Sequence, residues 1–65
     1  MPAAPPTKQR AKSEATREKL IAAAAEEFRI VGYFNTDTNK IATRAGYAPA
    51  TFYKHFKNKL DVFLA

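Results

Sequence analysis

The chain has 65 residues, a net charge of +5 and no cysteine, and its core must be thin, because a domain of this size buries only about 60% of the surface that its unfolded form exposes. The sequence contains neither a disulfide framework nor a cluster of histidine with carboxylates, and its longest apolar run, LIAAAA, is too short to span a membrane. We therefore expect a cytoplasmic protein that is not an enzyme and has no metal, cofactor or membrane partner.

The first predicted element is a basic arm at residues 1–12. The segment MPAAPPT contains three prolines and little to bury, which favours disorder. Lys8, Arg10 and Lys12 follow without any acid. We interpret the arm either as a solubilising tail or as a segment that enters the minor groove of DNA.

A first helix is predicted at about residues 13–31. Its apolar side chains recur at three- and four-residue spacing, with charged side chains between them. Ser13 or Thr16 could cap its start, and Gly32 is placed to end it in a left-handed conformation. We expect the phenylalanines to be core residues, namely Phe28, Phe34, Phe52, Phe56 and Phe63.

Two short helices follow, at about residues 38–45 and 49–56. Asp37 is placed to cap the first, because its carboxylate can accept hydrogen bonds from free backbone N–H groups. Gly46 permits the positive φ of a sharp turn, and Pro49 suits the first turn of the next helix. Two helices joined in this way predict a helix-turn-helix, which places its second helix in the major groove of DNA.

A fourth helix is predicted at residues 59–65, with Asn58 as its cap. Its apolar side chains, Leu60, Phe63 and Leu64, would remain exposed without a partner. We therefore expect the 65 residues to be the start of a longer protein.

The distribution of charge agrees with a DNA-binding motif. Residues 38–59 contain five cations and no acid, whereas residues 13–37 contain three cations and five acids. A basic segment of this kind points to a polyanionic partner. The sequence predicts an all-α, homeodomain-like helix-turn-helix module of three helices, with the start of a fourth, at residues 13–65.

The segment TNKIATRAGYAPATFYKHFKNKLDVFLA, which follows AAAAEEFRIVGYFNTD, resembles the DNA-binding domain of the tetracycline-repressor (TetR) family of bacterial transcription regulators. The resemblance covers about residues 16–65 and rests on Ile41-Ala42, Ala45-Gly46, Thr51-Phe52-Tyr53, His55-Phe56 and Lys59. It implies sequence-specific binding to a palindromic operator in double-stranded DNA by a homodimer. It also implies a repressor that a small-molecule effector releases, with the effector and dimerisation sites in a C-terminal domain absent from this segment.

The resemblance further implies which residues contact DNA. Four match positions that contact backbone phosphates, namely Thr38, Tyr53, His55 and Lys59. Five match positions that meet base edges or flanking phosphates, namely Tyr47, Pro49, Ala50, Thr51 and Lys54. Lys54 is the only one of these five with a long hydrogen-bonding side chain, and lysine can donate to guanine O6 and N7.

Two positions depart from the family pattern. Ala48 stands where the family usually has a serine or threonine, so the recognition helix loses its side-chain cap. Lys40 stands where an acidic residue is usual, which adds to the attraction for phosphate. Both departures affect the expected base preference.

Two other functions fit parts of the sequence. A protein-interaction module would use the first and fourth helices as a docking face and would show no salt-sensitive DNA binding. A basic amphipathic membrane-surface peptide is disfavoured, because the cations cluster with turn residues and not along one helix face.

Overall fold

The computed structural model describes the backbone of residues 8–65 and the side chains of residues 12–65. Its elements, in chain order, are α1 (Lys8–Val31), the 3-10 turn η1 (Tyr33–Asn35), α2 (Thr38–Ala45), α3 (Pro49–His55) and α4 (Lys59–Leu64). No strand occurs among these residues, and the predicted all-α fold is confirmed. None of the described helices combines the length and apolar character that a membrane span requires.

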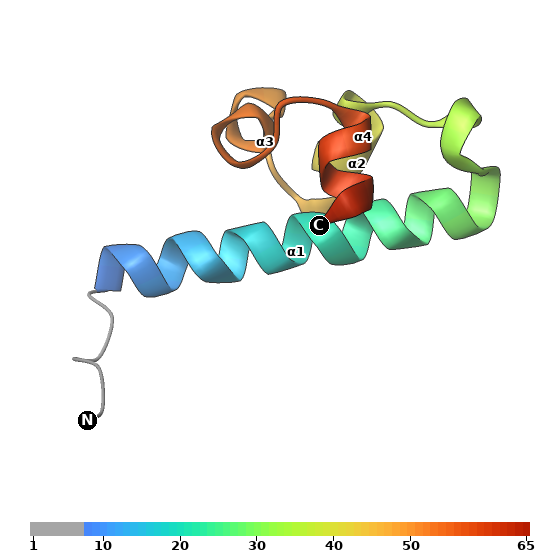
Figure 1. The fold of residues 1–65 in the computed structure, drawn as a ribbon. Coiled ribbons are helices and arrows are strands. Elements are labelled where there is room, and N and C mark those ends of the chain that lie inside the picture. The colour runs from blue at the N-terminus through green and yellow to red at the C-terminus, as the bar shows by residue number, and fades with distance from the viewer. Residues whose placement is uncertain (1–7) are drawn as a thin grey trace.

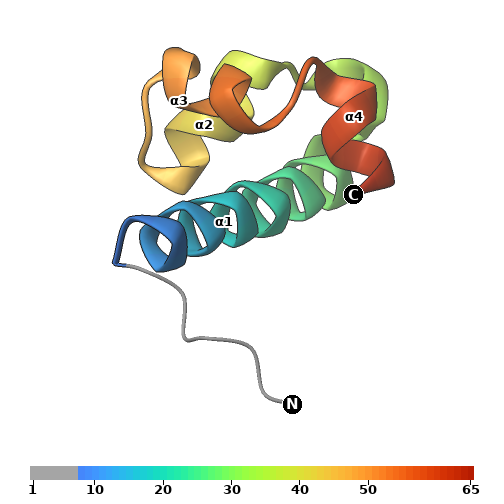
Figure 2. The same cartoon turned by 60° about the vertical axis from the view of Figure 1, so that its left-hand side comes forward.

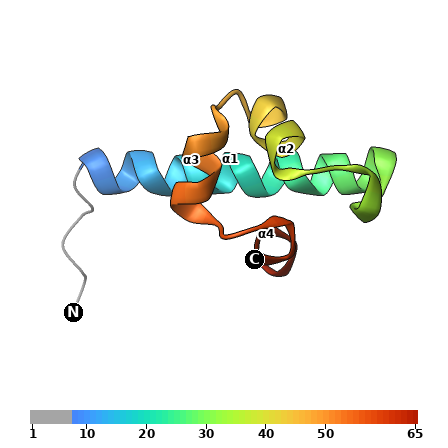
Figure 3. The same cartoon turned by 90° about the horizontal axis from the view of Figure 1, so that it is seen from above.

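The three short helices lie on one side of α1 (Figures 1 and 2). Helix α1 packs against α2 and α4, and α2 packs against α3. The buried core joins all four helices, through Leu20, Ala23, Ala24, Ile41, Ala42, Phe52, Phe56 and Val62. Seen from above, α2 and α3 lie over the middle of α1, α4 lies to one side of it, and the first turns of α1 extend past α3 (Figure 3).

Helix α1 begins at Lys8, five residues before its predicted start. The predicted disorder is therefore wrong for residues 8–12, while its part at residues 1–7 lies outside the described residues. The predicted cap is also wrong, because Thr16 lies inside the helix and its hydroxyl donates to the Lys12 carbonyl at 2.9 Å. Lysine, arginine, glutamate and alanine are good helix formers, so propensity extends the helix beyond its apolar face.

The turn between α2 and α3 has the predicted local chemistry. The Asp37 carboxylate accepts from the Lys40 N–H at 2.8 Å and caps α2. Gly46 has φ 88° and ψ 26°, in the left-handed region, and its N–H donates to the Thr43 carbonyl at 3.0 Å. Helix α3 begins at Pro49 without a side-chain cap, as expected with alanine at the preceding position.

The other two junctions show one confirmation and one difference. The Asn58 side chain accepts from the Asp61 N–H at 2.8 Å and caps α4, as predicted. Gly32 ends α1 with a φ of 84°, but its ψ of 159° lies outside the left-handed helical region. Its positive φ reverses the chain into η1 without forming the predicted helical cap.

The phenylalanines divide between core and surface. Phe52 and Phe56 are buried, and Phe28 is half-buried against the core. Phe34 is 90% exposed, because it lies in η1, where helical spacing does not apply. Phe63 is 54% exposed, although its ring contacts those of Phe28 and Tyr33 at centroid distances of 5.5 and 5.3 Å. The core prediction is therefore wrong for Phe34 and Phe63.

Candidate nucleic-acid interface

Two hydroxyl groups meet where α2 begins beside α3. Thr38 is the first residue of α2, and Tyr53 lies on the exposed face of α3. Their oxygens are 2.7 Å apart, in a hydrogen bond that either group could donate. A hydroxyl has one donor and two acceptor sites, so the pair retains capacity for another partner, and Tyr53 is 55% exposed. This geometry suits a ligand such as phosphate that accepts hydrogen bonds.

The predicted base-reading residues lie along α3 and the turn before it. Pro49, Ala50 and Lys54 are exposed, and Thr51 is half-buried. Tyr47 is half-buried and packs against the core, so its ring also supports the fold. Besides Tyr53, helix α3 therefore presents small side chains and one lysine to the solvent.

His55 and Lys59 have different surroundings. His55 is half-buried at the end of α3, with its ring centroid 6.4 Å from that of Phe56. The Lys59 ammonium donates to the Thr36 carbonyl at 3.2 Å and lies 4.3 Å from the centroid of Tyr33. The structure therefore gives Lys59 contacts within the chain that the sequence did not predict.

The three cations of the predicted arm lie in the first turns of α1. Lys12 is exposed, and the backbone at Lys8 and Arg10 is helical. No group of histidine, cysteine and carboxylate side chains in the described part of the chain could hold a metal ion.

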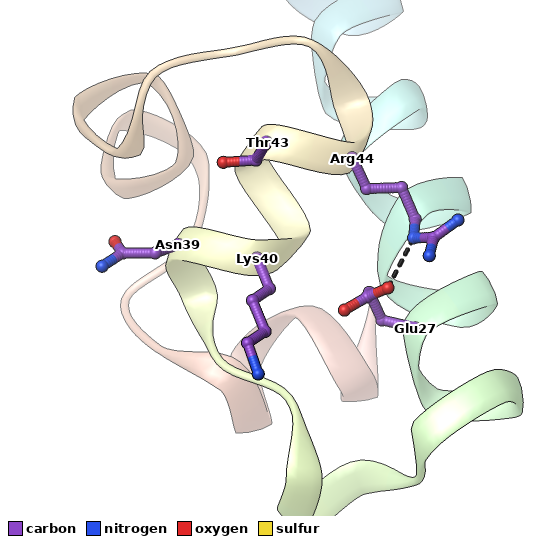
Figure 4. A pocket seen from close by; sticks show the side chains of 5 residues that line it. All are labelled: Glu27, Asn39, Lys40, Thr43 and Arg44. Carbon is purple, nitrogen blue, oxygen red and sulfur yellow. Dashed lines mark hydrogen bonds and ion pairs between the residues drawn. The ribbon is translucent and has the colours of Figure 1, made fainter.

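A pocket of about 550 Å³ borders α2, lined by Glu27, Asn39, Lys40, Thr43 and Arg44 (Figure 4). Asn39 and Thr43 point away from α1, whereas Arg44 reaches back to Glu27 of α1. The exposed Lys40 adds positive charge beside the start of α2. The pocket is an open hollow on the surface along α2.

Glu27 is a functional candidate that the sequence did not reveal. It is 6% exposed and accepts hydrogen bonds from the Thr36 hydroxyl and from the Arg44 guanidinium. These two bonds lower the pKa of the Glu27 carboxyl, so it is ionised at neutral pH. Its helical spacing from Leu20 and Ala24 predicts that Glu27 is buried. Its hydrogen-bond partners could not be predicted, because they are distant in sequence.

Comparison with known proteins adds a second kind of evidence. The family described as "Bacterial regulatory proteins, tetR family" matches residues 20–65. The chain is 41% identical over 49 residues to the HTH-type transcriptional activator FasR of Mycolicibacterium smegmatis. It is 40% identical over 63 residues to the HTH-type transcriptional regulator TcmR of Streptomyces glaucescens. It is 32% identical over 54 residues to the uncharacterized HTH-type transcriptional regulator YdgC of Bacillus subtilis.

These alignments cover 75%, 97% and 83% of the chain, but only 22%, 27% and 28% of the three relatives. The chain thus spans about a quarter of the length of these curated relatives. No solved structure matches it significantly.

Proposed function

The chain belongs to the TetR family of bacterial regulatory proteins and forms the DNA-binding domain of a transcriptional regulator; from this premise, we propose that it reads a specific operator with α3 and the start of α2. The observation that carries the proposal is the Thr38–Tyr53 hydroxyl pair, which joins the start of α2 to the exposed face of α3 at 2.7 Å. In a helix-turn-helix, these are the parts that approach the DNA backbone and the major groove.

We assign two roles to the site residues. Contacts with backbone phosphates come from Thr38, Tyr53, His55 and Lys59. Contacts with base edges or flanking phosphates come from Tyr47, Pro49, Ala50, Thr51 and Lys54. Lys54 is exposed on α3 and carries the only long hydrogen-bonding side chain of the second group, so it is the main candidate for direct base recognition. Lys8, Arg10 and Lys12 on α1 supply additional phosphate attraction.

For the full-length regulator, we propose a homodimer that binds a palindromic operator in the cytoplasm. We further propose that it represses transcription by blocking the operator, and that a small-molecule effector bound outside these 65 residues releases it. FasR is named as an activator, so the sign of regulation in this family depends on the individual protein. Relatives of this class are regulators and not enzymes, and we propose no catalytic role.

A protein-interaction function is the alternative. The observation that supports it is an apolar pocket of about 280 Å³ between α1 and α4, where a partner could bind. The pocket is lined by Ile21, Ala24, Ala25, Phe28, Val62, Phe63 and Ala65. A protein partner there would bind without the strong salt dependence of DNA binding. Salt dependence therefore separates the two functions.

The test uses duplexes selected by the 65-residue chain from a random-sequence pool, with affinity measured by fluorescence anisotropy at several salt concentrations. Lys54→Ala should weaken binding by about 1–3 kcal/mol and relax the preference at one base pair. Lys57→Ala removes the same charge from an exposed position outside the proposed site, and should leave base preference unchanged. Failure to select any duplex, or equal effects of both variants on base preference, would contradict the proposal.

A further inference from the structure

Glu27 is a carboxylate on a face of α1 that is otherwise apolar. Leu20, Ala23 and Ala24 precede it on the same buried face. Burying a charge is costly unless the charge is paired and hydrogen-bonded. A leucine at this position would fill the core without the cost of burying a charge. The charge of Glu27 is therefore compensated by its contacts.

Each carboxylate oxygen of Glu27 holds a different segment. Its Oε1 accepts from the Thr36 hydroxyl at 2.9 Å, and its Oε2 accepts from Nε of Arg44 at 2.5 Å. Thr36 lies just before α2, and Arg44 lies in the last turn of α2. One side chain of α1 therefore holds both ends of α2, and Figure 4 shows the Arg44 contact.

The segment that enters α2 connects this anchor to the proposed DNA-binding surface. Thr36 is 4% exposed, and its carbonyl accepts from Lys59 of α4 at 3.2 Å. Two residues later, the Thr38 hydroxyl bonds to Tyr53 of α3. Because only Asp37 separates Thr36 from Thr38, a shift of the buried Thr36 would also move the half-buried Thr38.

We propose that Glu27 is a positioning residue for DNA binding: it fixes both ends of α2 against α1 and so keeps Thr38 beside Tyr53, without touching DNA itself. The inference rests on the proposed function of the hydroxyl pair. A side chain that only stabilised the fold would change DNA affinity in proportion to the folded fraction. A positioning residue changes the affinity of the folded protein.

The two roles can be separated because replacing both partners of a buried hydrogen bond with apolar groups of the same shape can be nearly neutral for stability. The variant combines Glu27→Leu with Thr36→Val, which removes both partners of the buried hydrogen bond and leaves no orphaned group between them. Arg44 has a 40% exposed side chain and can turn to the solvent. We expect a thermal midpoint close to that of the parent and roughly a three- to thirtyfold loss of affinity for the selected duplex.

The matched control combines Glu26→Leu with Thr16→Val. It makes the same two residue-type changes, but both lie on α1, where the half-buried Glu26 hydrogen-bonds to Arg29 three residues along the same helix. Both variants and the parent are measured at the same series of salt concentrations, so that the lost negative charge is compared like for like. The control should bind the duplex at least as tightly as the parent.

A second measurement does not depend on DNA. In the free protein, nuclear Overhauser contacts between the Thr38 methyl group and the Tyr53 ring report the hydroxyl pair. We expect them in the parent and in the control, and expect them to weaken in the Glu27→Leu/Thr36→Val variant. If the parent selects no duplex while the variant loses these contacts, the proposed DNA binding is contradicted. The role of Glu27 in keeping Thr38 beside Tyr53 is then still supported.

The positioning role is overturned if the variant keeps both the contacts and the parental affinity, or if affinity falls only with the folded fraction. Should the double variant unfold, Glu27→Gln decides the question. Glutamine keeps an acceptor for Thr36 and loses the ion pair with Arg44, so weakened Thr38–Tyr53 contacts and an intermediate affinity are expected. A folded Glu27→Gln variant with parental contacts and parental affinity would also overturn the role.

Discussion

The corner between α2 and α3 and the end formed by α4 differ in how fully they are packed. At the corner, Ile41, Ala42 and Phe52 are completely buried. In α4, Val62 is the only buried residue, while Phe63 is 54% and Leu64 72% exposed. The apolar side chains at the corner are thus covered by other residues of this chain. Most apolar side chains of α4, by contrast, face the solvent.

This difference predicts how strongly substitutions in the two regions will change the stability of the protein. A completed core leaves little room for change, because substitutions there create cavities or strain. An exposed apolar helix loses little when one side chain is shortened. We therefore expect the stability of the chain to depend on the corner much more than on α4.

The largest effect is expected for Phe52→Ala. Removing a fully buried phenylalanine ring costs about 3–5 kcal/mol, against a total stability of about 3–10 kcal/mol for a domain of this length. The thermal midpoint measured by circular dichroism should therefore fall further than in any other variant below. Phe63→Ala, the matched change in α4, should cost about 1 kcal/mol. Equal losses of thermal midpoint in the two variants would remove the contrast between corner and α4.

Substitution of Gly46 should have the next largest effect. Valine is strained at a φ of 88°, and we expect Gly46→Val to lose about 1–3 kcal/mol of stability together with helicity and DNA binding. A Cβ at this position would meet nothing within 4 Å, so the cost comes from the backbone alone. Gly46→Asn should therefore lose less, because asparagine tolerates the left-handed region. A Gly46→Val variant that melts like the parent would show that the turn does not depend on this conformation.

A smaller effect on stability is expected for Tyr53→Phe. The ring keeps its contact with Phe52, at a centroid distance of 5.4 Å, and only the hydrogen bond with Thr38 is lost, at about 0.5–1.5 kcal/mol. DNA affinity should fall for all duplexes alike. The salt dependence should not change, since a hydroxyl group releases no counterion. Binding at parental affinity would exclude the hydroxyl pair from the interface.

The smallest effect on stability is expected for Lys59→Ala. It removes the contacts with the Thr36 carbonyl and the Tyr33 ring, at a cost of about 0.5–1 kcal/mol. If Lys59 also contacts a phosphate, the slope of log K against log salt should flatten by roughly 1. Lys57→Ala is the charge-matched control. An altered base preference with an unchanged slope would rule out the phosphate role and leave Lys59 with its contacts inside the protein.

The corner was predictable because its structure is decided by neighbouring residues. Asp37 caps the helix that starts one residue later, and Gly46 supplies the backbone conformation of its own turn. Spacing along α3 likewise distinguished the buried Phe52 from the exposed Lys54. The start of α1 was missed, because helix propensity there acts without an apolar pattern.

The contacts around the candidate site were not predictable in the same way. Glu27 bonds to residues 9 and 17 positions away, and Lys59 reaches back 23 positions to Thr36. Such pairings depend on how α1, α2 and α4 pack, which a periodic pattern does not specify. Even the proximity of Thr38 and Tyr53, 15 positions apart, follows from the helix-turn-helix geometry and not from their spacing.

The length of α1 has a consequence for local unfolding. From Lys12 to Lys19 each side chain is exposed or half-buried, and Leu20 is the first buried residue among the side chains of α1 that the structure describes. The one ring contact of this segment with the core is that of the Arg17 guanidinium, 5.5 Å from the centroid of Phe56, and a helical segment of this length with so little tertiary packing has marginal stability. Its hydrogen bonds should therefore open without unfolding of the core, and its amides should exchange with solvent much faster than those that follow Leu20. One continuous helix would then contain two cooperative units, with their boundary at the first core residue.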